Sequence, residues 1–406
     1  MSKLLVDTGI KWIGKIPEDW NVVKVNKMFY RRKEINQDDN PTILSLARSG
    51  VKIRDISNNE GQLAESYDNY HKVHIGDLML NPMDLISGAN CSVSYVEGVI
   101  SPAYINLTRK TECNSRYYDY FFKNQYWVNA MFIHGKGVSF DNRWTMNAET
   151  IMDYKIPVPP VDEQNKIAAY LDDKCNKIDT IIEDNNREIE LLEEYSKNIF
   201  RDETSKYSTN VFKLKYLVSK KLQYGANSSG QEYKEDLPRY VRITDIVNNG
   251  LKNDDMLSLS EEDAKDFILH EGDILFARSG GTVGKSFLYK NCYGKCAFAG
   301  YLIRAQFDDL ELSKYIYNYT NSVLYDEWKN SIFIQSTIQN IGADKYSVMP
   351  IPIPVDRNAI KLINKNILNK TEKIEKVIEY RKRIIDKLEE LKKSLIYEVI
   401  TGKKEV

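Results

Sequence analysis

The chain has 406 residues, with 57 Lys+Arg against 58 Asp+Glu and a formal net charge of −1, so it is not a uniformly basic nucleic-acid binder. No apolar run reaches the ~18 residues of a membrane span, and no basic start followed by an apolar stretch indicates a secretory signal. The five cysteines and four histidines are scattered, which disfavours a disulfide framework and a metal site and favours a reducing, cytoplasmic location.

The chain reads as two copies of one plan. Residues 1–155 form a mixed, strand-rich segment, and the Pro-rich stretch 156–160 leads into a long charged helix that ends near residue 205. Residues 206–350 form a second strand-rich segment, and a Pro-rich stretch at 351–354 leads into a second long helix. The Pro-rich stretches lie 195 residues apart, and the pairs Gly76-Asp77 and Gly272-Asp273 lie 196 apart. A repeat of this length predicts two structural units related by a pseudo-two-fold axis.

The two long helices are predicted to pair with each other. Their apolar residues follow alternating steps of four and three, which is a heptad seam, and the register is the same in both copies. Residues 161–205 carry 6 Lys+Arg against 13 Asp+Glu, whereas residues 350–406 carry 14 against 9, so the helices have opposite charge. Antiparallel pairing would place Asn185 opposite Arg381; two separate surface helices are the alternative. The seam residues are Leu171, Ile178, Ile182, Asn185, Ile189 and Leu192, and then Ile374, Ile378, Arg381, Ile385 and Leu388.

Polar loops between the predicted strands supply candidates for contacts with DNA. Arg, Lys, Ser, Thr, Asn and Gln side chains reach phosphates and base edges, although any single loop of this kind could be a solvated turn. Most of the 27 tyrosines are interpreted as packing residues, with base stacking as the alternative. The candidates are Arg48, Lys136, Ser139, Asn142 and Arg143 in the first segment, and Arg242, Arg278, Ser279, Thr282, Lys285, Gln335 and Thr337 in the second.

No pattern in the sequence supports a catalytic centre. Residues 282–286 match the end of a phosphate-binding loop, but Ser279 stands where that motif requires Gly. No G-x-G-x-x-G is present, so a dinucleotide or methyl-donor fold has no support. The sequence therefore predicts a recognition or scaffold protein without a metal or cofactor of its own.

Three segments resemble the specificity subunit of type I restriction–modification enzymes, and the resemblance covers essentially the whole chain. Residues 10–20, IKWIGKIPEDW, resemble the lead-in to that family's first target-recognition domain. Residues 156–164, IPVPPVDEQ, resemble its central conserved region, and residues 272–280, GDILFARSG, resemble a recurrent segment of its recognition domains. The second copy departs from the pattern because Pro354 is followed by Val-Asp-Arg-Asn and lacks an equivalent of Glu163-Gln164.

The resemblance implies an α+β protein. Target-recognition domains at 1–155 and 206–350 would be joined by spacer helices at 156–205 and 351–406, which form an antiparallel coiled coil. Such a subunit is not catalytic; it reads a bipartite, asymmetric target in double-stranded DNA. Two modification (methyltransferase) subunits would methylate adenine with S-adenosylmethionine, and restriction (motor–nuclease) subunits would cleave with ATP and Mg²⁺. The alternatives are a coiled-coil protein scaffold without DNA contact and a stand-alone methyltransferase or nuclease.

Overall fold

The structure is a computed structural model that describes residues 3–56, 66–83, 85, 90–137, 144–247, 250–333 and 340–406. It divides into two compact units, unit 1 with Met1–Asn185 and Arg383–Val406 and unit 2 with Asn186–Lys382. Each unit therefore contains one globular part together with a portion of each long helix.

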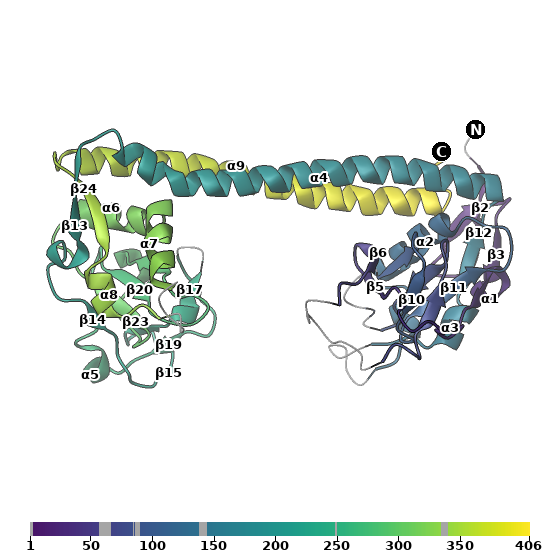
Figure 1. Cartoon of the computed structure of the whole chain (residues 1–406), viewed down its shortest axis with the longest axis horizontal. Helices are drawn as coiled ribbons and strands as arrows, with labels where there is room; N and C mark the ends of the chain where they lie inside the picture. Colours follow the sequence, from purple (N-terminus) through teal and green to yellow (C-terminus); the bar gives the residue numbers. More distant parts are fainter. Residues whose placement is uncertain are drawn as a thin grey trace. The chain divides into compact units, whose positions relative to one another are not determined.

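Unit 1 is built on a four-stranded antiparallel sheet in the order β4-β11-β8-β9, of which Figure 1 labels β11. A two-stranded ribbon of β3 and β12 joins the first strands of the domain to the start of the long helix. The elements of its globular part are β1 (Leu5–Asp7), β2 (Lys15–Pro17), β3 (Asn21–Lys24), α1 (Val25–Met28), β4 (Phe29–Arg31), β5 (Leu44–Ala47), β6 (Gly50–Ile53), β7 (His71–Val73), β8 (Leu78–Leu80), β9 (Cys91–Val93), β10 (Gly98–Ile100), β11 (Ile105–Arg109), α2 (Ser115–Trp127), η1 (Phe132–His134), α3 (Ala148–Asp153) and β12 (Lys155–Val158).

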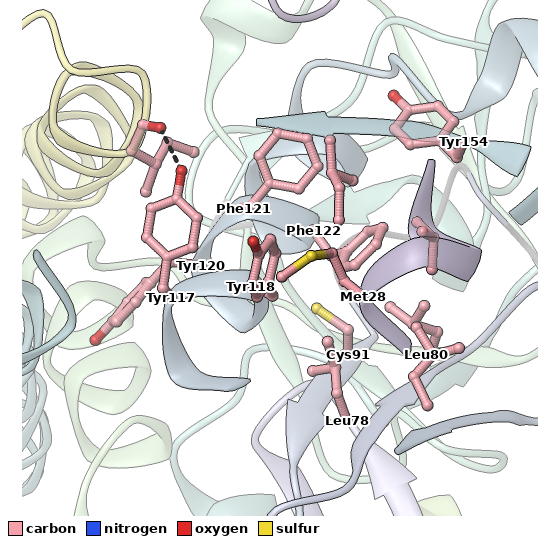
Figure 2. Close-up of a cluster of buried hydrophobic side chains, with 14 of the residues drawn as sticks. Met28, Leu78, Leu80, Cys91, Tyr117, Tyr118, Tyr120, Phe121, Phe122 and Tyr154 are labelled. Atoms are coloured by element: carbon pink, nitrogen blue, oxygen red, sulfur yellow. Dashed lines mark hydrogen bonds between the residues drawn. The ribbon is translucent and has the colours of Figure 1, made fainter. Parts of the chain in front are cut away.

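Helix α2 closes the core of unit 1 with a run of aromatic side chains. Asn114 caps its first turn by accepting the main-chain N–H groups of Arg116 and Tyr117. Figure 2 shows the rings gathered with Leu78, Leu80 and Cys91 of the sheet. The Tyr117 hydroxyl donates a hydrogen bond of 3.0 Å to the carbonyl oxygen of Ile400, which ties α2 to the last turn of the C-terminal helix (Figure 2). The fully buried rings of α2 are Tyr117, Tyr118, Phe121 and Phe122.

Unit 2 repeats the central sheet with the order β14-β23-β20-β21, again antiparallel throughout; Figure 1 labels β14, β20 and β23 of this sheet. The ribbon of β13 and β24 corresponds to that of β3 and β12. The elements of its globular part are β13 (Thr209–Lys213), η2 (Leu214–Tyr216), β14 (Gln223–Tyr224), β15 (Gln231–Glu232), β16 (Arg239–Val241), η3 (Ile243–Asp245), β17 (Ile246–Val247), β18 (Gly250–Leu251), β19 (Leu257–Ser258), α5 (Glu261–Ala264), β20 (Ile274–Ala277), β21 (Ser286–Leu288), η4 (Asn291–Tyr293), β22 (Cys296–Phe298), β23 (Leu302–Ala305), α6 (Leu310–Thr320), α7 (Val323–Phe333), α8 (Ala343–Ser347) and β24 (Pro350–Pro354).

The sequence repeat corresponds to matching strands in the two units. Strands β8 and β20 both follow a Gly-Asp pair whose glycine has a φ of +89°. A parallel contact between Ile43 and Val99 in unit 1 has its counterpart in the parallel pairing of β16 with β22 in unit 2. The two units therefore share strand order and strand direction, although their loops differ in length and composition.

The long helices are α4 (Val161–Thr204) and α9 (Ala359–Ile400), and they pack together. Asp162 and Glu163 stand at the positive end of the α4 dipole, just after two prolines. Within unit 2, Glu203 lies 2.6 Å from the ammonium group of Lys370, and Glu188 forms an ion pair with Arg381. Partner numbers rise on α9 as they fall on α4, so the helices run antiparallel. The predicted α+β fold with two long packed helices is confirmed.

Both helix stretches in unit 1 also pack against each other along the seam. Leu171 of α4 joins the same core cluster as Ile400 of α9, and Lys392 donates to Asp179 at 2.6 Å.

Seam residues Ile178, Ile189 and Ile374 are each 8% exposed, and the remaining predicted seam residues are buried or half-buried. The Asn185 side chain donates to the carbonyl of Ile181 one turn earlier. The predicted pairing of Asn185 with Arg381 joins the two units and stays a prediction.

Candidate nucleic-acid interface

Each central sheet ends in a pair of loops at equivalent places. The first loop of each pair connects β8 to β9 (81–90) or β20 to β21 (278–285). The second loop returns beside it: the N–H of Met146 donates to the carbonyl of Pro82 at 2.8 Å, and the N–H of Ile341 donates to the carbonyl of Arg278 at 2.9 Å. We call the described residues within 81–90 and 135–146 the unit 1 loop pair, and those within 278–285 and 340–341 the unit 2 loop pair.

Two of the five predicted residues of unit 1 lie among the described residues, one on its loop pair and one on a neighbouring hairpin. Lys136 is exposed and pairs with Thr145 through two main-chain hydrogen bonds of 2.7 and 3.0 Å, so it stands at the base of the second loop. Arg48 is exposed in the turn between β5 and β6, and Gly50 of this hairpin lies against Ser92 of β9. The predicted residues Ser139, Asn142 and Arg143 lie outside the described residues.

Four of the seven predicted residues of unit 2 lie on one turn, between β20 and β21. Ser279 pairs with Asn340 of the second loop, and Thr282 and exposed Lys285 complete the connection from β20 to β21. An added Cβ at Gly280 or Gly281 would meet none of the described residues within 4 Å, so that part of the chain leaves this turn open to a ligand. Gln335 and Thr337 lie outside the described residues.

Most arginines of the globular part of unit 2 are engaged by their own chain. Arg242 forms hydrogen bonds of 3.0 and 2.8 Å to the two carboxylate oxygens of Asp245 and one of 2.7 Å to a main-chain carbonyl. Arg239 and Arg304 likewise donate to main-chain carbonyls of neighbouring loops. These contacts support a structural role for Arg242, so its predicted contact with DNA has less support than that of Arg278.

Arg278 differs from the other arginines. Its guanidinium lies over the ring of Tyr224, 5.1 Å from the centroid, and among the described residues it has neither a hydrogen-bond acceptor nor an ion-pair partner. Its main chain is fixed on both sides, by Ile341 and by a 3.1 Å hydrogen bond to the carbonyl of Tyr301. An arginine that is held in place and has no hydrogen-bond acceptor in the part of its chain that the structure describes is suited to donate hydrogen bonds to another molecule.

The sequence reasoning missed Tyr224 and Tyr301, which flank Arg278 and are 41% and 65% exposed. A sequence signal was present, because each tyrosine adjoins a glycine. An added Cβ at Gly225 would come within 2.6 Å of main-chain atoms of the strand end at 298–299, and one at Gly300 would overlap Asn227. Glycines at both places mark a crossing of two chain segments that brings the tyrosines to the same surface.

The repeated Gly-Asp pair has a structural role. Asp77 and Asp273 each accept the main-chain N–H three residues earlier at 3.0 Å, which closes the turn before the strand. Each aspartate also pairs with an arginine, Asp77 with Arg32 at 3.1 Å and Asp273 with Arg304 at 3.7 Å, and Thr108 donates to Asp77 at 2.7 Å. Burial raises the pKa of Asp273, and the hydrogen bond from His270 and the charge of Arg304 oppose it only in part.

Gln164 of the central motif is also structural. Its side chain is fully buried; it accepts the main-chain N–H of Asn114 at 2.9 Å and donates to the carbonyl of Pro159 at 2.8 Å. It thereby links the start of α4 to the start of α2. In unit 2, Asn364 makes the corresponding link by donating to the carbonyl of Glu311 at 2.8 Å, so the missing Glu-Gln is replaced by a residue one turn further along.

Neither a metal site nor a membrane helix is found in the part of the chain that the structure describes. No three His, Cys, Asp or Glu side chains there are grouped so that they could hold a metal ion. Within the same residues, no helix is long and apolar enough to cross a bilayer.

Known proteins match this arrangement along the whole chain. The chain is 24% identical to the MjaIX specificity subunit of Methanocaldococcus jannaschii over 67% of its own length and 68% of the relative's. It is 20% identical to the MjaVIII specificity subunit of the same organism over 96% and 94% of the two lengths. Its fold matches, with a TM-score of 0.71 and 10% identity, a chain from a structure of a type I restriction–modification system, covering 96% of this chain and 100% of that one.

The family described as "Type I restriction modification DNA specificity domain" matches residues 17–191 and again residues 209–390. The two matches coincide with the two halves of the repeat. The chain therefore belongs to the family of type I restriction–modification specificity subunits, the non-catalytic members of these systems that select the DNA target.

Proposed function

We propose that this chain reads a bipartite, asymmetric DNA target, with the domain at 1–155 on one half-site and the domain at 206–350 on the other. The observation that carries the proposal is the pair of equivalent loop pairs with different side chains. The position of Arg278 in unit 2 is occupied by Pro82 in unit 1, although both residues accept the same main-chain hydrogen bond. The two domains share a main-chain frame but present different side chains, which suits recognition of two half-sites with different sequences.

In this proposal the helices at 156–205 and 351–406 act as the spacer between the half-sites. α4 has 44 residues without a break, which corresponds to about 66 Å at ~1.5 Å per residue. A long unbroken helix suits a spacer between two half-sites, whose separation dimeric DNA-binding proteins likewise set by their geometry.

The helix pair also carries apolar side chains outside its seam, which support the docking of partner subunits. Ile181 and Leu391 in unit 1 are 46% and 55% exposed, and Tyr195 and Val377 in unit 2 are 45% and 42% exposed. Each of the four directly precedes a position of the same heptad series, at residues 182, 196, 378 and 392, so all four hold the same heptad position beside the seam. Residues 181 and 377, like residues 195 and 391, are repeat equivalents. The same kind of surface thus occurs once in each unit, which fits two copies of one partner.

We infer that these partners are two modification subunits that methylate adenine with S-adenosylmethionine, after flipping the base out of the duplex. Restriction subunits that use ATP and Mg²⁺ would join for cleavage. All of these cofactors would be bound by the partner subunits. This division of labour fits the net charge of −1, because partner subunits can share the contacts to phosphate.

The test is methylation mapping with the complex of this chain and its modification subunits. Sequencing of methylated DNA gives the target of the wild-type complex, and Lys136→Ala and Arg278→Ala are then compared with it. Each variant is expected to relax one half-site only, and a different one. Lys110→Ala and Lys290→Ala are matched controls, because both lysines are exposed and lie off the loop pairs. Changes in both half-sites from one variant, or in neither from both, would contradict the proposal.

A protein scaffold without DNA contact is tested by the salt dependence of duplex binding. Phosphate contacts release counterions, so the logarithm of the binding constant of the complex should fall linearly with the logarithm of salt concentration. A flat response would favour the scaffold.

A further inference from the structure

We propose that Tyr224 positions Arg278 to read a guanine in the half-site bound by unit 2. This inference rests on the proposed function and deepens it by naming a base and the residue that prepares its reader. Its starting point is the guanidinium of Arg278, which lies on an aromatic face and has no acceptor among the described residues.

The ring of Tyr224 is itself fixed. Its hydroxyl accepts the main-chain N–H of Ala343 at 3.0 Å, and β14 pairs Tyr224 with Ile303 of the central sheet. The crossing at Gly225 leaves no room for the chain to shift, because an added Cβ would come within 2.3 Å of the carbonyl oxygen of Phe298. The ring therefore forms a rigid support, and a cation over such a face is attracted to it.

The orientation of Arg278 favours a base edge over a phosphate. The Nε atom is buried and has no partner among the described residues, so the terminal nitrogen atoms are the donors left for a ligand. The aromatic ring holds the planar guanidinium in an orientation in which it can donate two parallel hydrogen bonds. Guanine offers two acceptors for them, O6 and N7, on its major-groove edge. A phosphate oxygen can be met by a flexible cation and needs no such support.

The described surroundings of Arg278 leave room for a base. No described residue lies within 4 Å of an added Cβ at Gly280 or Gly281, and Tyr301 beside Arg278 is 65% exposed. Unit 1 has Pro82 at the equivalent position, so the arrangement belongs to unit 2 alone. We therefore expect the guanine in the half-site of unit 2, and no guanine read from the equivalent place in unit 1.

The experiment measures base preference with the full chain assembled with its modification subunits. Methylation rates are compared on duplexes in which every position of the unit 2 half-site is replaced in turn by each of the other bases. The variants are Arg278→Lys, Tyr224→Leu and Tyr224→Phe. Tyr216→Leu is the matched control, since Tyr216 is an exposed tyrosine of the same unit with a lysine over its ring and lies away from the loop pair. Thermal unfolding of each variant shows that it is folded.

One guanine position is expected to lose about 10- to 100-fold of its discrimination in Arg278→Lys, because the bidentate contact is lost. Tyr224→Leu should relax the same position and no other, whereas Tyr224→Phe keeps the aromatic face and should stay within about threefold of wild type. Tyr216→Leu should leave all positions unchanged.

Three results would overturn the inference while leaving the proposed function intact. The first is a uniform loss at all positions with a shallower salt dependence, which marks a phosphate contact. The second is an unchanged base preference in both Arg278→Lys and Tyr224→Leu. The third is a Tyr224→Leu variant that relaxes a different position from Arg278→Lys, which excludes support of Arg278 by the ring. A wild-type complex that shows no defined bipartite target would instead refute the proposed function itself.

Discussion

Glu203 gives the sharpest test of the electrostatics of the helix pair. The residue lies near the end of α4, its side chain is 1% exposed, and it meets Lys370 of α9 at 2.6 Å and Lys206 at 2.7 Å, with Asn366 donating at 3.0 Å. Burial alone would raise the pKa of Glu203, but the hydrogen bonds from Lys206, Lys370 and Asn366 outweigh it and lower the pKa to about 2 from an ordinary 4.5.

The sign of the pH dependence follows from that direction. The carboxylate is favoured in the folded state, so its stabilisation is present above pH 4.5 and is lost as the pH falls from 4.5 towards 2. At about 1.4 kcal/mol per pKa unit, the shift corresponds to at most about 3 kcal/mol. The lysine side chains are partly exposed and Gln retains some hydrogen bonds, so we expect Glu203→Gln to lower the free energy of unfolding at pH 7 by about 1–2 kcal/mol.

The assay is hydrogen exchange of residues 186–204 and 359–382 in urea, measured for wild type and variant at pH 7 and at pH 3. Glu190→Gln is the matched control, because Glu190 is exposed on the same helix. The difference between wild type and Glu203→Gln should shrink as the pH falls, while Glu190→Gln should stay near wild type at both values. An equal difference at both pH values would refute the electrostatic reasoning.

Three further predictions address the frame and the spacer. Gly272→Ala should destabilise unit 2 by about 1–2 kcal/mol in urea unfolding, because the glycine has a φ of +89° and the new Cβ would lie 3.0 Å from a leucine side chain. Gly76→Ala should destabilise unit 1 by less, because Gly76 has the same φ but no such close leucine among the described residues. Gln164→Leu should cost about 2–4 kcal/mol in thermal unfolding of unit 1, since it leaves a buried N–H and a buried carbonyl unpaired; an unchanged melting temperature would show that the link is dispensable. One heptad inserted into both helices beside Asn185 and Arg381 adds ~10 Å of helix and should lengthen the spacer of the methylated target by about three base pairs. An unchanged spacer would contradict the proposal that the helices set the distance between half-sites.

The parts of the fold that follow from local periodicity could be predicted from the sequence. The heptad steps of α4 and α9 depend on residues three and four apart, and the repeat of 196 residues showed that both helices share one register. The opposite charges of the helices then favoured pairing within the chain. No local pattern gives the strand order of the central sheets, because β14 pairs with β23 almost eighty residues later.

The candidate site shows the same limit. Arg242 was predicted to contact DNA from its residue type. In the structure its guanidinium donates to the carboxylate of Asp245, three residues later in a 3-10 turn, and the sequence alone does not reveal this contact. Arg278 was predicted on the same grounds and proves to have no acceptor among the described residues. Tyr224, which supports it, is distant in sequence and adjacent only because two loops cross at Gly225. Whether an arginine has a structural role or is available to contact a base depends on its burial and on its long-range neighbours. Both are properties of the folded chain.

The two units share hydrogen bonds of the main chain at equivalent places, and these bonds let one frame carry unlike side chains. The turn before β8 and β20 is closed by the same N–H to carboxylate bond, and the loop pairs are joined by the same N–H to carbonyl bond at Pro82 and at Arg278. The second of these bonds does not depend on the side chain at the joining position, so Pro and Arg are equally compatible with it. Side chains on the loop pairs can therefore change without disturbing the sheet, whereas changes at Asp77, Asp273 or Gln164 would disturb it. We conclude that specificity should vary through the loop pairs, while the buried polar residues keep the frame that presents them.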